Sequence, residues 1–284
     1  MVINMKSIAI IGLGLIGGSI AKAVKKNSDI KVIGWNRDVS VAKTALEQGS
    51  IDSIWNKESM LEADIAVIST PPYATVSFLE ENARLFKKGM VVTDVCGVKE
   101  YIIVECERIC NENDLFFIGG HPMAGKEKGG YFNTDATLFV GASYIITPTE
   151  TTSQKATDIL KELINILKAG TITVTTPEFH DKVIAFTSQL PHVLAGAYVK
   201  SPLCTKRKGF SAGSFMDVSR VATADERLWT ELFMLNSENL VTEINTLINN
   251  LSAYRDAIIK GDNSRLSTII KEGREIKECD NLQF

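Results

Sequence analysis

The histidine best suited to chemistry in this chain lies between glycines and a proline. His121 stands in Gly-Gly-His-Pro-Met-Ala-Gly, at residues 119–125, and is one of only three histidines. The apolar run Leu115–Ile118 before it predicts a buried strand, and open α/β sheets place their ligands at the carboxyl ends of such strands. Because histidine exchanges protons near neutral pH, we interpret His121 as a candidate general base.

Two further candidates lie in the C-terminal part of the chain. His192 follows Pro191 in an apolar segment with helical spacing, so that its imidazole can face the same cleft. Arg220 lies on a predicted short helix, where it forms either a surface ion pair with Asp217 or a bidentate ion pair with a substrate carboxylate. The third histidine, His180, lies near the start of the helix that carries His192, and we assign it no role.

A glycine-rich turn near the N-terminus predicts a dinucleotide site. A β-branched run at residues 6–12 predicts a strand buried on both faces, and Gly-Leu-Gly-Leu-Ile-Gly-Gly-Ser follows at residues 12–19. Gly12 permits the tight turn, Gly14 lets the backbone approach a pyrophosphate, and Gly17 lets the next helix pack on the strand. The free N–H groups at the start of that helix then bind the phosphates.

The residues alone leave NAD and NADP both open. The position that often holds an acid for the ribose 2′-hydroxyl is Asn36, followed by Arg37. Asn36 does not repel a 2′-phosphate and Arg37 can pair with one, whereas Asn36 can equally bind a bare ribose. The other predicted cofactor contacts are Leu15, Ile16, Ser69, Thr70, Pro71, Thr75 and Asp94.

Alternating strands and helices predict the domain that positions these residues. With helices between them, strands are expected at 30–35, 64–69, 90–94, 115–118, 142–147 and 171–175. The alternation predicts an α/β fold, in which residues 1–176 form a doubly wound Rossmann domain with a parallel sheet. After Pro177 no strand is expected, and residues 177–284 are predicted to form an all-helical substrate and dimerisation domain.

Two irregularities are expected within the helical domain. Pro191 removes a main-chain hydrogen bond and should kink its helix, and a break is expected near Asn236. Apolar residues with helical spacing should be buried in the domain's own core or against a second subunit, as a homodimer: Leu228, Leu232, Leu235, Leu240, Ile244, Leu247 and Leu251.

The composition is that of a globular protein. The 284 residues are 45% hydrophobic and 23% charged, and the net charge of −3 predicts no nucleic-acid partner. No apolar run approaches the roughly 20 residues that a membrane helix needs. The strand at residues 6–12 leaves no room for a signal peptide. The five scattered cysteines predict reduced thiols in a cytoplasmic protein and no metal site.

The ordered set of motifs resembles the prephenate dehydrogenase family, which includes arogenate and cyclohexadienyl dehydrogenases. The resemblance spans nearly the whole chain. It is carried by the glycine-rich turn, by the segments that contain His121, His192 and Arg220, and by Thr93-Asp94, Gly97-Val98-Lys99 and Trp229. It implies a Rossmann domain followed by a helical domain that dimerises. We expect neither a fused chorismate mutase nor a regulatory module, so that any feedback by tyrosine acts at the active site.

The resemblance also implies a reaction and residue roles. The reaction is the oxidative decarboxylation of prephenate to 4-hydroxyphenylpyruvate in tyrosine synthesis, with hydride transfer to NAD, the cofactor that the family uses most often. By resemblance, His121 accepts the proton of the ring hydroxyl, His192 orients the substrate, and Arg220 binds a substrate carboxylate. Glu127 matches a position that shapes the entrance of the cleft.

Three departures from the family pattern affect the predicted substrate site. Gly97 and Gln189 replace the serine and histidine of many members, and Met216 replaces a lysine or arginine found in some. They leave the choice between prephenate and arogenate open. The alternatives are a β-hydroxyacid dehydrogenase or imine-type reductase, which commonly use a lysine as the acid, and a non-catalytic nucleotide-sensing dimer. The motif around His121 favours the prephenate dehydrogenase interpretation.

Overall fold

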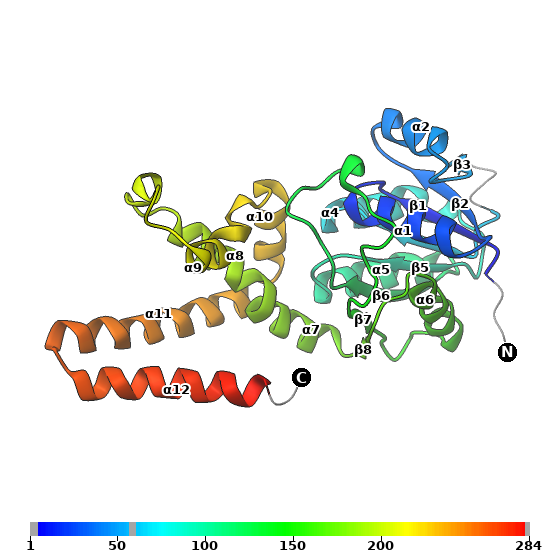
Figure 1. The fold of residues 1–284 in the computed structure, drawn as a ribbon. Helices are drawn as coiled ribbons and strands as arrows, with labels where there is room; N and C mark the ends of the chain where they lie inside the picture. Colours follow the sequence, from blue (N-terminus) through cyan, green and yellow to red (C-terminus); the bar gives the residue numbers. More distant parts are fainter. Residues whose placement is uncertain (1–4, 57–60, 282–284) are drawn as a thin grey trace. The chain divides into compact units, whose positions relative to one another are not determined.

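The computed structural model describes residues 5–56 and 61–281, and its N-terminal part is built on one sheet (Figure 1). The strands of this sheet are β1 (Ser7–Ile11), β2 (Lys31–Trp35), β3 (Ser53–Ile54), β4 (Ile65–Ile68), β5 (Val91–Asp94), β6 (Phe116–Pro122), β7 (Tyr144–Thr147) and β8 (Ile172–Val174). Their order across the sheet is β3-β2-β1-β4-β5-β6-β7-β8. The first six strands in this order have the doubly wound arrangement that the sequence predicts.

One strand pair differs from the predicted parallel sheet. β6 and β7 are antiparallel, with His121 opposite Ile145, whereas the other pairs are parallel. A parallel connection needs a crossover, usually a helix. Residues 123–143 supply only loops and the short 3₁₀ turn η2 (Tyr131–Asn133), so the chain returns alongside β6 in the opposite direction.

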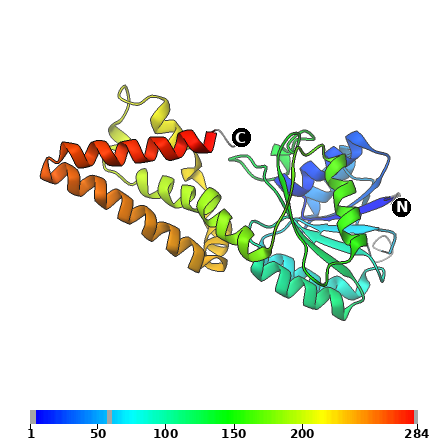
Figure 2. The same ribbon diagram turned by 90° about the horizontal axis from the view of Figure 1, so that it is seen from below.

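Helices cover both faces of the sheet (Figure 2). α1 (Leu15–Asn27) and α6 (Gln154–Ile166) pack on one face, and α4 (Pro72–Asn82) and α5 (Glu100–Glu112) pack on the other. The short α2 (Val39–Glu47) follows β2. Because side chains alternate along a strand, Ile8 and Ile10 of β1 join the first core, and Ala9 and Ile11 join the second. This double burial explains the continuous β-branched run of β1.

The remainder of the described chain is helical. Its helices are α7 (Pro177–Ile184), α8 (Leu190–Tyr198), α9 (Gly213–Ser219), α10 (Glu226–Leu235), α11 (Ser237–Lys260) and α12 (Asn263–Asn281). A π-helical segment at Ala185–Gln189 precedes Pro191, where an irregularity was expected. The predicted break near Asn236 is confirmed. Across residues 5–56 and 61–281, no helix is long and apolar enough to cross a membrane.

The helical part does not form a single compact unit. One unit ends at Asn236, so α7 to α10 belong with the sheet, while α11 and α12 form a second unit that begins at Ser237. The domain boundary at residue 176 stays a prediction.

A buried ion pair fixes the centre of the sheet to α5. The ammonium of Lys99 donates to Asp94 Oδ2, and both side chains are fully buried. The Asp94 carboxylate also accepts hydrogen bonds from the backbone N–H groups of Cys96, at 2.8 Å, and Gly120, at 3.2 Å. Asp94 therefore joins the end of β5 to the loop after it, to α5 and to β6.

Removing the Lys99 cation should leave a buried carboxylate without its counter-ion. We expect Lys99→Met to lower the free energy of unfolding by about 3–5 kcal/mol, because a buried charge that loses its partner is strongly destabilising. Urea unfolding followed by circular dichroism measures this difference. The matched control is Lys88→Met, which breaks the exposed pair with Asp114 and should change nothing measurable. Equal stability of the two variants would contradict the account.

Candidate active site

A cavity of about 610 Å³ opens at the carboxyl ends of the central strands. Its wall includes the glycine-rich turn after β1, the loops after β4 and β5, the end of β6, and side chains from α8 and α10. Many of the predicted site residues lie in this wall: Gly14, Leu15, Ile16, Ser69, Thr70, Pro71, Gly97, His121, Glu127, Gln189, His192 and Arg220. The fold thus brings predicted cofactor and substrate positions into one cavity.

The turn between β1 and α1 has the shape of a dinucleotide cradle. Gly12 has a φ of +95°, and a Cβ there would collide with the Ser69 carbonyl. A Cβ at Gly17 would overlap the Gly12 carbonyl oxygen, whereas at Gly14 it would meet nothing within 4 Å. α1 begins at Leu15 without a side-chain cap, so its first N–H groups are available to phosphate oxygens. These residues fit a bound dinucleotide.

The polar residues at the end of β2 hold the cradle together. Asn36 Oδ1 accepts from the backbone N–H of Leu13 at 3.0 Å, and Asn36 Nδ2 donates to the carbonyl of Asp38 at 3.0 Å. Arg37 is exposed beside it. Asn36 therefore makes two hydrogen bonds that hold the turn, besides any contact with a ribose.

Other predicted cofactor positions lie behind the cavity wall rather than in it. Thr75 is buried, and its Oγ1 donates to the Thr70 carbonyl at 3.0 Å. Asp94 is fully buried in its ion pair with Lys99. Gly12 and Gly17 likewise support the turn from behind. These residues shape the loops that line the cavity.

The expected strand ended at Ile118 and left His121 in the loop after it. In the structure His121 lies within β6 instead. The strand extends to Pro122, because the segment pairs with β7 on its far side. A Cβ at Gly120 would lie only 2.9 Å from the Asp94 carbonyl oxygen, so the glycine is needed for this close strand packing. His121 is therefore held on a rigid element at the edge of the cavity.

The surroundings of His121 favour its neutral form. Burial, the neighbouring His180 and the Lys99 ammonium hold the pKa of His121 well below its usual range. A neutral imidazole at physiological pH has a free lone pair on one ring nitrogen and can accept a proton. The electrostatics of the site therefore agree with the predicted general base.

His180, to which the sequence motifs assign no role, is the direct neighbour of His121. His121 Nδ1 lies 2.9 Å from His180 Nε2, and His180 Nδ1 lies 2.6 Å from Asp181 Oδ1. Both His180 and Asp181 are buried in α7. The adjacent His-Asp pair was visible in the sequence, but His121 is 59 residues away, and only the fold brings them together.

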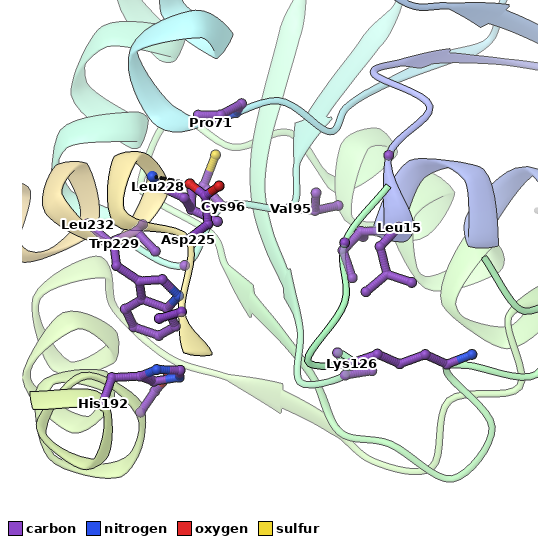
Figure 3. A pocket seen from close by; sticks show the side chains of 18 of the residues that line it. Leu15, Pro71, Val95, Cys96, Lys126, His192, Asp225, Leu228, Trp229 and Leu232 are labelled. Atoms are coloured by element: carbon purple, nitrogen blue, oxygen red, sulfur yellow. Dashed lines mark hydrogen bonds between the residues drawn. The ribbon is translucent and has the colours of Figure 1, made fainter. Parts of the chain in front are cut away.

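The opposite wall of the cavity is formed by aromatic and apolar side chains of the helices. The imidazole of His192 lies against the indole of Trp229, with ring centroids 3.5 Å apart and planes at 31° (Figure 3). Leu228 and Leu232 of α10 extend this wall. Burial is also the main cause that lowers the pKa of His192.

Arg220 and Glu127 meet at the exposed side of the cavity. Arg220, at the start of η5 (Arg220–Thr223), donates from an NH group to Glu127 Oε1 at 2.9 Å. The alternative pairing of Arg220 with Asp217 is not the one in the structure. The Arg220 guanidinium lowers the pKa of Glu127, so this carboxylate stays ionised. The Arg220 side chain remains 63% exposed, accessible to an anionic ligand.

Two of the three positions that depart from the family pattern, Gln189 and Gly97, have different surroundings, and the third, Met216, is exposed. Gln189 is buried, with its Nε2 donating to the Leu232 carbonyl at 3.1 Å and its Oε1 accepting from Asn236 at 2.9 Å. A Cβ at Gly97 would meet Leu232 at 3.6 Å and the His121 ring at 4.0 Å. Gln189 therefore connects α10 to the π-helical segment, while Gly97 leaves room beside His121.

The glycine-rich turn fits a dinucleotide and the neutral His121 in the same cavity can accept a proton, which is the combination that a dinucleotide-dependent oxidoreductase needs. Residues 20–173 match the profile of the prephenate dehydrogenase nucleotide-binding domain, and residues 176–272 match that of the prephenate dehydrogenase dimerization domain. The chain belongs to the prephenate dehydrogenase family, as its motifs predict.

Similar proteins cover nearly the whole chain. A prephenate dehydrogenase from Lactococcus lactis subsp. cremoris is 33% identical over 97% of this chain and 77% of its own length. A cyclohexadienyl dehydrogenase from Zymomonas mobilis subsp. mobilis is 30% identical over 96% of this chain and 95% of its own length. The crystal structure of prephenate dehydrogenase from A. aeolicus, with hydroxyphenyl propionate and NAD+, superposes with a TM-score of 0.85 at 26% identity, covering 99% of each chain.

Two glycines of the cradle should respond differently to the addition of one methyl group. Gly14→Ala should leave the melting temperature unchanged but weaken NADH binding, because its Cβ enters only the open space that the dinucleotide would fill. Gly17→Ala should lower both the melting temperature and the affinity for NADH, since its Cβ overlaps the backbone of Gly12. Thermal unfolding and NADH fluorescence titration separate these effects. Native NADH affinity in Gly14→Ala would argue against the cradle.

Proposed function

We propose that this protein is an NAD-dependent dehydrogenase that converts prephenate into 4-hydroxyphenylpyruvate and CO2. The observation that carries the proposal is the position of His121, a neutral base in the same cavity as the dinucleotide cradle and Arg220. The similar A. aeolicus enzyme, solved with NAD+ and a hydroxyphenyl acid, supports the choice of cofactor and substrate class.

His121 handles the proton of the reaction. A nicotinamide held by the glycine-rich turn would supply the hydride acceptor for the ring carbon that bears the hydroxyl. His121 takes the hydroxyl proton as that carbon is oxidised, so that no positive charge develops on the oxygen. The bond between the ring and its carboxylate then breaks, CO2 leaves, and the electron pair of that bond stays in the ring. His121 returns the proton to the phenolic oxygen. Because the product ring is aromatic, the sequence of steps is strongly downhill.

The remaining cavity residues hold and enclose the substrate. Arg220 offers a fork of N–H donors that suits a carboxylate, and its present partner Glu127 keeps the guanidinium at the cavity edge. His192 and Trp229 give a flat wall for a ring, and Leu232 adds apolar surface that excludes water. Positioning of this kind supplies a large share of enzymatic rate enhancement.

The substrate assignment is tested by measuring NADH formation with prephenate, arogenate and 3-hydroxy acids. We expect turnover with prephenate. Turnover with the 3-hydroxy acids alone would overturn the assignment.

Replacing the base should affect turnover rather than binding. We expect His121→Asn to lower kcat by about 10²–10⁴-fold, because the amide keeps a hydrogen bond but cannot accept a proton. KM for prephenate should change little. Steady-state NADH formation gives both constants, and a near-native kcat for this variant would exclude His121 as the base.

Removing the cation at the cavity edge should affect binding instead. We expect Arg220→Ala to raise KM for prephenate by at least about tenfold, which corresponds to about 1.4 kcal/mol of lost carboxylate binding. Arg220→Lys should give an intermediate KM, because it keeps the charge but loses the fork. The matched control is Arg227→Ala, an exposed arginine outside the cavity wall, with native KM. Native KM in Arg220→Ala would contradict the assignment.

We further propose that the chain forms a homodimer through its C-terminal helices. The dimerization-domain match over residues 176–272 supports this proposal. So do the exposed apolar side chains of α11 and α12, which are Val241, Ile248, Leu251, Ile258, Ile259, Ile270 and Ile276. Light scattering at micromolar concentration should give twice the chain mass of 31.1 kDa, and a monomer would contradict the proposal.

We also propose that the protein is located in the cytoplasm. Five free cysteines are present, and Cys96, Cys106 and Cys110 are buried in the core. Burial raises the pKa of the Cys110 thiol to about 12, so it stays protonated and unreactive. Unpaired thiols of this kind are typical of a reducing compartment.

A further inference from the structure

A continuous series of hydrogen bonds leads from His121, in the cavity wall, to two buried side chains behind it. His121 of β6 contacts His180 at 2.9 Å, and His180 contacts Asp181 at 2.6 Å, both in α7. His180 and Asp181 are 2% and 1% exposed, so the hydrogen bond between them is shielded from solvent.

The position of each proton in this series follows from the Asp181 carboxylate. Asp181 accepts from the backbone N–H groups of Lys99, at 2.7 Å, and Glu100, at 2.9 Å. An ionised carboxylate only accepts hydrogen bonds, so His180 Nδ1 must carry a proton to donate to it. His180 is neutral, because burial lowers its pKa. His180 Nε2 is therefore an acceptor.

The acceptor nitrogen of His180 in turn fixes the tautomer of His121. Since His180 Nε2 is an acceptor, the proton between the two rings belongs to His121 Nδ1. The neutral ring then has its lone pair on Nε2, which is the nitrogen that does not face His180. A base that takes a proton from a bound hydroxyl needs this lone pair.

We propose that His180 is a positioning residue that, backed by Asp181, holds His121 in the Nδ1–H tautomer. The inference rests on the proposed function for its role in catalysis. As the substrate O–H bond breaks, the new N–H bond forms at His121 Nε2. The imidazolium that results keeps its Nδ1–H hydrogen bond to His180, which in turn donates to the Asp181 anion. The proton returns to the product oxygen by the same route.

The other charged groups near the His121–His180–Asp181 hydrogen bonds already have partners. Lys99 is paired with Asp94 within the buried network of β5 and α5. Asp181 also caps the start of α5, where Lys99 offers no side-chain cap of its own. A change at Asp181 would therefore disturb α5 as well as the tautomer, and His180 is the better position for a test.

The tautomer can be observed without substrate. The chain contains only three histidines, so imidazole ¹⁵N shifts of ¹⁵N-histidine protein can be assigned with a His192→Gln and a His180→Gln variant. We expect protonated Nδ1 and unprotonated Nε2 for both His121 and His180 at neutral pH. A protonated Nε2 on His121 would overturn the proposal, even if prephenate proved not to be the substrate.

Kinetics of two variants then test the role in catalysis. In His180→Gln the side-chain oxygen can still accept from His121 Nδ1, whereas in His180→Leu nothing can. We expect His180→Leu to lose about 100-fold or more in kcat with KM and NADH affinity unchanged. His180→Gln should recover at least about tenfold of that loss and keep the wild-type His121 shifts.

A variant elsewhere in the core controls for general loss of stability. Tyr131→Phe removes a buried hydroxyl bonded to Ser50 at 2.9 Å, outside the cavity wall, and should leave kcat unchanged. If His180→Leu does not fold, the His180→Gln kinetics and the wild-type shifts still decide the question. Equal kcat in the His180 variants and wild type, or losses confined to KM and NADH affinity, would overturn the proposal.

Discussion

The carboxylate of Asp181 is the contact on which the arrangement of the site depends. It accepts two backbone N–H groups at the start of α5 and one hydrogen bond from His180, so a single buried anion joins α7 to α5 and, through His180, to His121 of β6. A buried carboxylate with fewer partners would be costly, because the low-dielectric interior penalises unpaired charge. The bonds that satisfy Asp181 therefore also fix the orientation of His180 toward His121.

A second buried anion, Asp94, likewise joins several elements, here β5, α5 and β6. Its bonds to Lys99, Cys96 and Gly120 hold the strand against β5 and α5. Because Asp94 and Asp181 both bind parts of Lys99, one residue at the start of α5 links the two anions. Networks of this kind are stable only when complete, and a complete network makes a rigid support for a base.

Structural features that depend on a few neighbouring residues were predicted correctly from the sequence. The glycine-rich turn, the strand and helix alternation and the break near Asn236 follow from residue type and spacing over a few positions. The extension of β6 through His121 was missed because it depends on pairing with β7, a partner that comes later in the chain. The antiparallel direction of β7 was missed because the sequence between 123 and 143 does not reveal how the loop returns.

Long-range polar contacts were harder still. His121 and Arg220 were recognised by their motifs, but their partners, His180 and Glu127, lie 59 and 93 residues away in the chain. The task of Asn36 in the turn was likewise hidden, since a short polar side chain suits both a ribose and a backbone N–H. Residue type states which bonds are needed, and only the fold shows which atoms make them.

The most direct test of this account is the pH dependence of kcat/KM for prephenate. Burial and the neighbours His180 and Lys99 hold His121 neutral, so protonation of the proposed base should begin only well below its ordinary pKa of about 6.5. Burial shifts the pKa of His192 in the same direction. We expect kcat/KM to stay constant from neutral pH past 6.5 and to fall only at lower pH. A decline with its midpoint at or above about 6.5 would contradict the account of a base kept neutral by the fold.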